Sequence, residues 1–151
     1  MTIGEVVLPV IVQVAYGIAV AAVLWLVWHV RRRYPSVPKR ISLRLRFDGR
    51  PSKPTGPRVI VWVAPIALVL VTALLTVLLV KSPPPPDQRV QIALVFVILA
   101  ETAWATGWST DRQIELARGM TYRVAPARML RVFVPILVTV AVTLFLAIRP
   151  A

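Results

Sequence analysis

The stretch VIVWVAPIALVLVTALLTVLLV, residues 59–80, decides the fold class. Its 22 residues include no charged side chain, and the apolar positions are continuous rather than alternating. About 20 such residues are needed for a helix to cross the hydrocarbon core of a bilayer. Valine favours strands in water, but a segment surrounded by lipid satisfies its own backbone polar groups only as a helix. The stretch therefore predicts a transmembrane helix.

Three further apolar runs lie on either side of this stretch. They cover residues 6–30, 90–108 and 132–148, and each has the length that a membrane-spanning helix requires. The last run is the shortest, with 17 residues, and it carries Pro135 near its beginning, where a helix tolerates proline. The four runs make up over half of the 151 residues. We therefore predict an all-α membrane protein, a single domain of four transmembrane helices in an antiparallel bundle.

Charged residues are segregated from these runs. The chain has 18 Lys and Arg against 6 Asp and Glu, a formal net charge of +12. A soluble domain interleaves polar and apolar residues because its whole surface is wetted, so the segregation argues against a free nucleic-acid-binding domain. The absence of cysteine excludes disulfides and thiolate metal sites, and a single histidine excludes a histidine cluster. We expect no nucleic acid partner, no metal and no cofactor.

The distribution of the basic residues predicts an orientation. The connection over residues 31–58 holds ten of them and that over 109–131 holds five, whereas the opposite side has three. Basic residues are retained on the cytoplasmic side of a membrane, so both long connections are predicted to be cytoplasmic and both termini to lie outside. All five tryptophans fall near the predicted cytoplasmic side, as interface anchors. The expected location is a bacterial plasma membrane.

The first cytoplasmic connection has the least generic pattern. Residues 41–47, ISLRLRF, alternate apolar and polar side chains with a period of two, which predicts an extended segment with two faces. One interpretation places this segment on the anionic inner leaflet, with Ile41, Leu43, Leu45 and Phe47 dipping into the lipid and the arginines facing phosphates. The other makes it a docking strand for a protein partner. Under both, the contact surface consists of Arg31, Arg32, Arg33, Arg40, Arg44 and Arg46.

Residues of the same connection resemble a known family. The chain reads Tyr34-Pro35-Ser36-Val37-Pro38, followed by Ile41, Phe47, Gly49, Pro51 and Gly56. This order is similar to the loop of the small bacterial multi-span membrane proteins related to SdpI, an immunity protein against a secreted peptide toxin. The resemblance implies an immunity-like or signalling role. Where the family tends to have Pro and His, this chain has Ser42 and Arg44, so no role of that histidine carries over.

One acidic residue, Glu101, lies inside a predicted span. It is 12 residues from Arg89 and 11 from Arg112, which places it about 16–18 Å from each basic boundary, close to the bilayer midplane. A charged carboxylate at this depth costs about 2.5–3.5 kcal/mol, so we expect Glu101 to face other helices. Two roles are open, a structural hydrogen bond between helices and a site for a proton or ligand. The residues predicted to share its depth and bond to it are Tyr16, Thr72 and Thr139.

Together these features predict a non-enzymatic integral membrane protein. It engages a peptide or protein partner through its loops or a helix groove, as the resemblance to the SdpI-related family implies. An enzyme is disfavoured because no pair of carboxylates and no nucleophile with a base share one depth. Two alternatives stay open: an accessory subunit of a larger membrane complex, and a small pore-forming or transport protein of the holin type in which Glu101 acts.

Overall fold

The computed structural model describes residues 3–41, 56–119 and 125–148. Within these ranges the chain is helical apart from short turns and two strands of two residues each, and four helices are long and apolar enough to cross a membrane. This confirms the predicted all-α class. The elements are α1 (Ile3–Arg33), η1 (Tyr34–Ser36), β1 (Arg40–Ile41), β2 (Gly56–Pro57), η2 (Arg58–Trp62), α2 (Val63–Lys81), η3 (Pro86–Gln88), α3 (Arg89–Ala117) and α4 (Pro126–Ile148).

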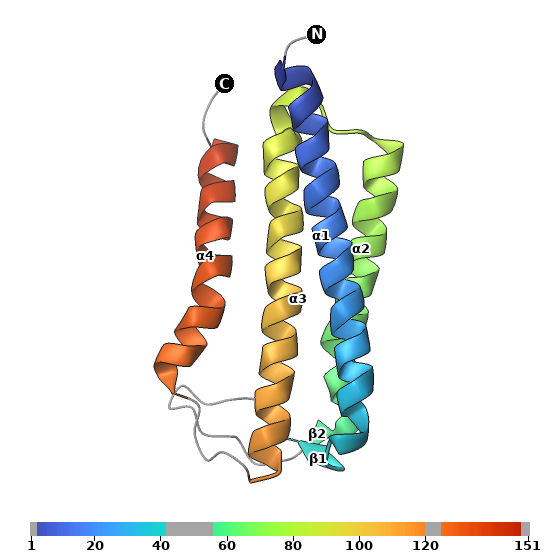
Figure 1. The fold of residues 1–151 in the computed structure, drawn as a ribbon, viewed down its shortest axis with the longest axis vertical. Helices are drawn as coiled ribbons and strands as arrows, with labels where there is room; N and C mark the ends of the chain where they lie inside the picture. The colour runs from blue at the N-terminus through green and yellow to red at the C-terminus, as the bar shows by residue number, and fades with distance from the viewer. Residues whose placement is uncertain (1–2, 42–55, 120–124, 149–151) are drawn as a thin grey trace.

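The four long helices stand side by side (Figure 1). Helices that follow one another in the chain are antiparallel, and α1 begins where α4 ends, at the same end of the bundle. At the other end, which we call the basic end, α1 closes with Arg31, Arg32 and Arg33 beside the two strands and the last turn of α3. The most extensive contact joins α1 and α3, which run parallel, so the main interface is between helices that are not consecutive.

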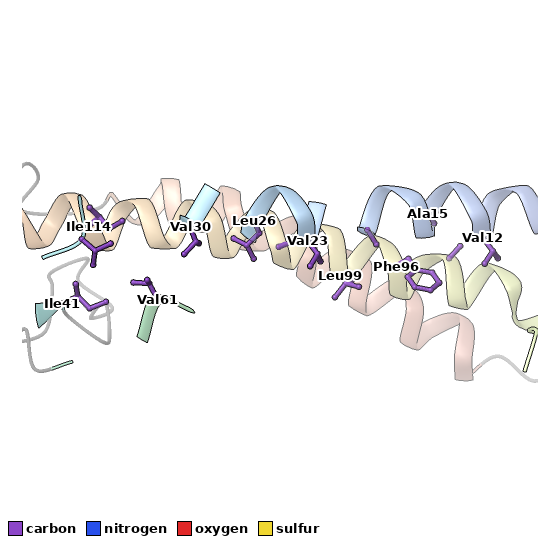
Figure 2. Packing of buried hydrophobic residues seen from close by; sticks show 14 residues of the cluster. Val12, Ala15, Val23, Leu26, Val30, Ile41, Val61, Phe96, Leu99 and Ile114 are labelled. Atoms are coloured by element: carbon purple, nitrogen blue, oxygen red, sulfur yellow. The ribbon is translucent and has the colours of Figure 1, made fainter. Parts of the chain in front are cut away.

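The core of the bundle is the seam between α1 and α3. Buried residues on both helices recur every three or four positions, which is the spacing that turns one helical stripe toward a partner. Many of them are small, which lets the two backbones approach closely, as in other membrane helix pairs. Figure 2 shows this row of apolar side chains along the two helices. The row contains Val12, Ala15, Ala19, Val23, Leu26 and Val30 from α1, and Ala93, Phe96, Leu99, Ala103 and Ile114 from α3.

Gly107 extends this seam toward the basic end. A Cβ atom at this position would lie 2.8 Å from two ring atoms of Trp25, so only glycine leaves room for the indole against α3. The Trp25 ring in turn stacks on the His29 imidazole, with 4.9 Å between the ring centroids. The close contact at Gly107 therefore sets the position of an aromatic pair on α1.

Helices α2 and α4 are peripheral. The buried residues of α2 are Pro65 and Thr72, and that of α4 is Val132. Most of their remaining side chains are apolar and exposed. In water such surfaces would be unfavourable, but lipid tails solvate them without cost, so this exposure is what a bilayer-embedded bundle requires.

The helices are longer than the apolar runs that predicted them. The third run was predicted to end at residue 108, but α3 continues to Ala117 and stops before Gly119, whose φ of +72° ends the helix. An apolar run measures the width of the hydrocarbon core, whereas a helix continues into the polar interface as long as its side chains permit. The prediction for Pro135 was wrong: α4 starts at Pro126, so Pro135 lies inside the helix. Toward the basic end α4 bends away from α3 (Figure 1), and a proline inside a helix is a common cause of such a bend.

Candidate functional site

The intramembrane acid Glu101 lies on α3 on the side that faces α4. Thr139 Oγ1 of α4 donates a hydrogen bond of 3.1 Å to Glu101 Oε1. The same hydroxyl lies 3.0 Å from the carbonyl oxygen of Pro135, so its single proton is shared between two acceptors. The second carboxyl oxygen, Oε2, is buried and has no hydrogen-bond partner in the part of the chain that the structure describes.

Of the three predicted partners of Glu101, the structure brings only Thr139 to it. The Tyr16 hydroxyl instead donates to Thr76 Oγ1 at 3.1 Å, because the Thr76 proton is used on the carbonyl of Thr72. Thr72 donates to its own helix, to Leu68 O at 2.7 Å. The prediction that Tyr16 and Thr72 bond to Glu101 was wrong. Glu101 faces α4, whereas α1 and α2 pack on the opposite side of α3 (Figure 1).

Among the residues that the structure describes, hydrogen bonds at Glu101 and Gln91 join α4 to α3. Besides the Glu101–Thr139 bond, Gln91 Nε2 donates to the carbonyl oxygen of Leu146 at 3.2 Å, near the end opposite the basic end. Hydrogen bonds between membrane helices contribute about 0.6–2 kcal/mol each. Because α4 buries so little apolar surface, these two bonds fix its register and rotation against α3.

Glu101→Leu is expected to lower the free energy of unfolding by about 0.6–2 kcal/mol, whereas Glu101→Gln keeps an acceptor for the Thr139 hydroxyl and costs less than about 0.5 kcal/mol. Unfolding by sodium dodecyl sulfate in lipid micelles measures both. Thr139→Val is the matched variant, because it removes the same bond from the other side. If the losses of Glu101→Leu and Thr139→Val simply add in the double variant, the bond makes no contribution of its own.

An ion cluster links α1 to α3 at the basic end. His29 Nε2 donates to Asp111 Oδ2 at 3.0 Å, and Arg33 Nε lies 3.1 Å from Asp111 Oδ1 in an ion pair. The side chains of His29 and Asp111 are each about one fifth exposed, so solvent screens the cluster only in part. Sequence reasoning did not identify Asp111 as a candidate residue. Its partner lies 82 residues away in the chain, and no local spacing reveals such a pair.

A small folded cap covers the basic end. Strand β1 pairs antiparallel with β2, in the register Arg40 to Pro57 and Ile41 to Gly56. Ile41 is fully buried and Val37 is 5% exposed. In Figure 2, Ile41 and Val61 lie next to Ile114 at the end of the core row. The interpretation that Ile41 dips into the lipid was therefore wrong, because this side chain packs inside the protein beside α3. Leu43, Leu45 and Phe47, which the same interpretation placed in the lipid, lie outside the described residues.

The cap leaves its basic side chains on the outside. We call the exposed set the basic platform: Arg31, Arg32, Arg33, Lys39, Arg40 and Arg58. Aromatic rings support part of it, since the Arg58 guanidinium lies 5.0 Å from the centre of the Tyr34 ring and that of Arg32 lies 5.4 Å from Trp28. Of the arginines predicted for this surface, Arg44 and Arg46 lie outside the described residues.

A lateral groove opens between α3, α4 and the segment from η2 to the start of α2. Its volume is about 490 Å³. Its walls include the apolar side chains Phe133 and Ile136 of α4, on either side of Pro135 in the sequence, and Ile60 and Val61 of η2. Along its floor α3 presents a polar row, Thr102, Thr106, Ser109, Thr110 and Gln113. We call it the α3–α4 groove.

The surroundings of these sites contain no evident metal centre. Among residues 3–41, 56–119 and 125–148, no group of three or more His, Asp or Glu side chains is placed to hold a metal ion. No protein-family model matches the chain, and no curated protein or solved structure is significantly similar to it. The similarity to the SdpI-related proteins therefore rests on the loop residues alone.

Proposed function

We propose that the chain is a non-enzymatic integral membrane protein whose basic platform binds an acidic segment of a peptide or protein partner. Residues with like charge gather on one face of the molecule, which favours a partner of opposite charge and speeds its encounter. The resemblance of residues 34–56 to the loop of SdpI-related immunity proteins supports the same role. The positive-inside pattern supports a platform in the bacterial cytoplasm.

The burial of Ile41 carries this proposal. A lipid anchor would leave Ile41 available to the bilayer, but Ile41 is committed to the core beside Ile114, and Val37 before it is buried in the same cluster. The backbone amide of Arg58 also donates to the carbonyl of Lys39 at 3.3 Å, which ties the two halves of the cap together. The basic side chains are thus held on an ordered support, and fixed charges bind a partner at lower entropic cost than charges on a flexible chain.

The experiment is photo-crosslinking in native membranes, with a photoreactive amino acid in place of Arg40. The expected result is a defined crosslinked protein species that disappears at high salt, because the contact is electrostatic. Ser82, exposed at the opposite end, is the matched control position and should give no such species. Charge reversal of Arg32 and Arg58 should lower the crosslinking yield at least about tenfold. Crosslinks from position 40 to lipid only would contradict the proposal.

A second candidate function is proton binding at Glu101. The buried Oε2 without a partner favours it, because an oxygen in this state has free capacity for one proton or one donor. Dissipation of the proton gradient on expression in cells is the relevant assay. Loss of that activity in Glu101→Gln, with folding retained, would support proton chemistry, and unchanged activity would leave Glu101 a purely structural residue.

A further inference from the structure

His29 contacts an aromatic ring and a carboxylate at the basic end. Its imidazole stacks on the Trp25 indole, with 4.9 Å between the centroids and 23° between the planes, and its Nε2 donates to Asp111 Oδ2 at 3.0 Å. Gly107 leaves the room that this indole occupies. Both neighbours interact favourably with an imidazolium, the carboxylate through its charge and the indole face through a cation–π contact. The site therefore accommodates a protonated His29 without rearrangement.

The Asp111 carboxylate is shared between His29 and Arg33. Arg33 Nε lies 3.1 Å from Asp111 Oδ1 in an ion pair, but this oxygen receives no hydrogen bond from the residues that the structure describes. The Arg33 contact lacks the alignment of a hydrogen bond, so it is the weaker of the two contacts of this carboxylate. The Arg33 side chain is also 46% exposed, so it can turn toward solvent or a partner. A positive charge on His29 would therefore loosen Arg33 from Asp111.

Proton uptake by His29 changes the net charge of this cluster. With a neutral imidazole, the charges of Arg33 and Asp111 compensate each other, whereas with an imidazolium one positive charge is left over. The other acid that α3 carries at this end, Glu115, is already paired with Arg112 at 2.6 Å. The remaining charged side chains that α1, α3 and the cap bring to this end, among the described residues, are all basic: Arg31, Arg32, Lys39, Arg40, Arg58 and Arg118. No free acid in that part of the chain offsets the added charge.

We propose that protonation of His29 strengthens the binding of an acidic partner segment to the basic platform. Histidine is the residue type whose charge changes between about pH 5 and 8, and His29 is the single histidine of the chain. Its side chain is 18% exposed, so water reaches the ring. Arg33 belongs to the platform and lies one helical turn from His29, well inside the screening length of about 8 Å at physiological ionic strength. The inference rests on the proposed function, because it concerns the regulation of the same platform.

The test is binding of a fluorescent, acetylated peptide of aspartates to the full chain in phosphatidylcholine nanodiscs, at about pH 5.5 and about pH 8. Aspartate stays ionised at both values, and a zwitterionic membrane does not compete for the platform. Binding should be about threefold tighter at the lower pH, because one charge is added within the screening length. Equal binding at the two pH values overturns the coupling and leaves the proposed function intact, whereas a peptide that binds at neither pH contradicts both.

Three variants assign the effect to this cluster. His29→Gln removes the titrating group but keeps an amide donor for Asp111, so it should bind the peptide alike at both pH values. Arg128→Gln, the matched control, removes one exposed charge of α4 outside the platform and should keep the difference of about threefold. Asp111→Asn leaves Arg33 uncompensated, so its binding at about pH 8 should match that of the unaltered protein at about pH 5.5. A pH difference that persists in His29→Gln contradicts the proposal, as does a folded Asp111→Asn that binds no more tightly; if Asp111→Asn fails to fold, as judged by circular dichroism, His29→Gln decides.

A second measurement reads the charge of His29 itself. Nuclear magnetic resonance of the chain with isotope-labelled histidine gives the signals of one imidazole, because the chain has one histidine. Coupling between two binding sites is reciprocal, so the peptide of aspartates, added to saturation at about pH 7, should raise the protonated fraction of His29. An unchanged fraction in the presence of bound peptide overturns the coupling.

Discussion

Phe96→Ala is expected to lower the free energy of unfolding by about 2–4 kcal/mol, a little less than in a soluble core because lipid also solvates the unfolded helices. Phe96 is 1% exposed in the seam between α1 and α3. Its ring meets that of Tyr16 edge to face, at 5.4 Å between centroids. The helices are held apart by neighbouring buried side chains and cannot close over the cavity. Unfolding by sodium dodecyl sulfate, followed by tryptophan fluorescence, measures the loss.

The matched control is Phe133→Ala. Phe133 has the same side chain but is 41% exposed on the peripheral helix α4, so its loss should cost less than about 1 kcal/mol. Equal losses in the two variants would contradict a core centred between α1 and α3.

Ile41→Asp should open the cap while leaving the four long helices in place. Ile41 is fully buried, and a carboxylate at its position has no water, which costs about 3 kcal/mol or more. The loss stays local because β1 and β2 have two residues each and Ile41 meets the bundle at its end, in the cluster near Ile114. Hydrogen exchange of the Arg58 amide, which is bonded to Lys39 O, reports on the opening. Binding at the basic platform should fall with it.

Val59→Asp provides the control for this variant. Val59 lies in η2 and is 57% exposed, so the same charge is introduced into the same cap without burial. Exchange in the cap should stay close to that of the unaltered protein. If Ile41→Asp also leaves the exchange unchanged, the cap is not anchored by this side chain, and the support for the basic platform is lost.

The number and the approximate places of the four spanning helices could be predicted from sequence, because uninterrupted apolar length is a local property of the chain. The run 59–80, for example, contains no charge, and α2 lies within it apart from its last residue, Lys81. The beginning of that run is not α-helical as predicted, because the 3₁₀ helix η2 precedes α2. Pro65 lacks an amide donor and its ring crowds the carbonyl four residues earlier, so the α-helical pattern starts only at Val63.

The pairing of the helices could not be predicted in the same way. Depth alone placed Tyr16, Thr72 and Thr139 at the level of Glu101, but the rotation of each helix decides which of them it contacts, and rotation depends on packing. A signal was present for α1 and α3: small residues recur at helical spacing in both, as at Ala15, Ala19 and Ala103. For Asp111 the signal was weaker. It is an acidic residue just after the third apolar run, at the same depth as the arginines that follow the first apolar run.

The parallel pairing of α1 with α3 also constrains the order in which the protein assembles during synthesis. The ribosome delivers α1 and α2 to the membrane first, and these two share only a small interface. The partner that buries the apolar stripe of α1 emerges only after residue 89 and is complete at Ala117. Lipid or the insertion machinery must cover that stripe in the interval. A nascent chain stalled before α3 therefore carries two inserted helices without a core, exposed to membrane quality control until the third helix arrives.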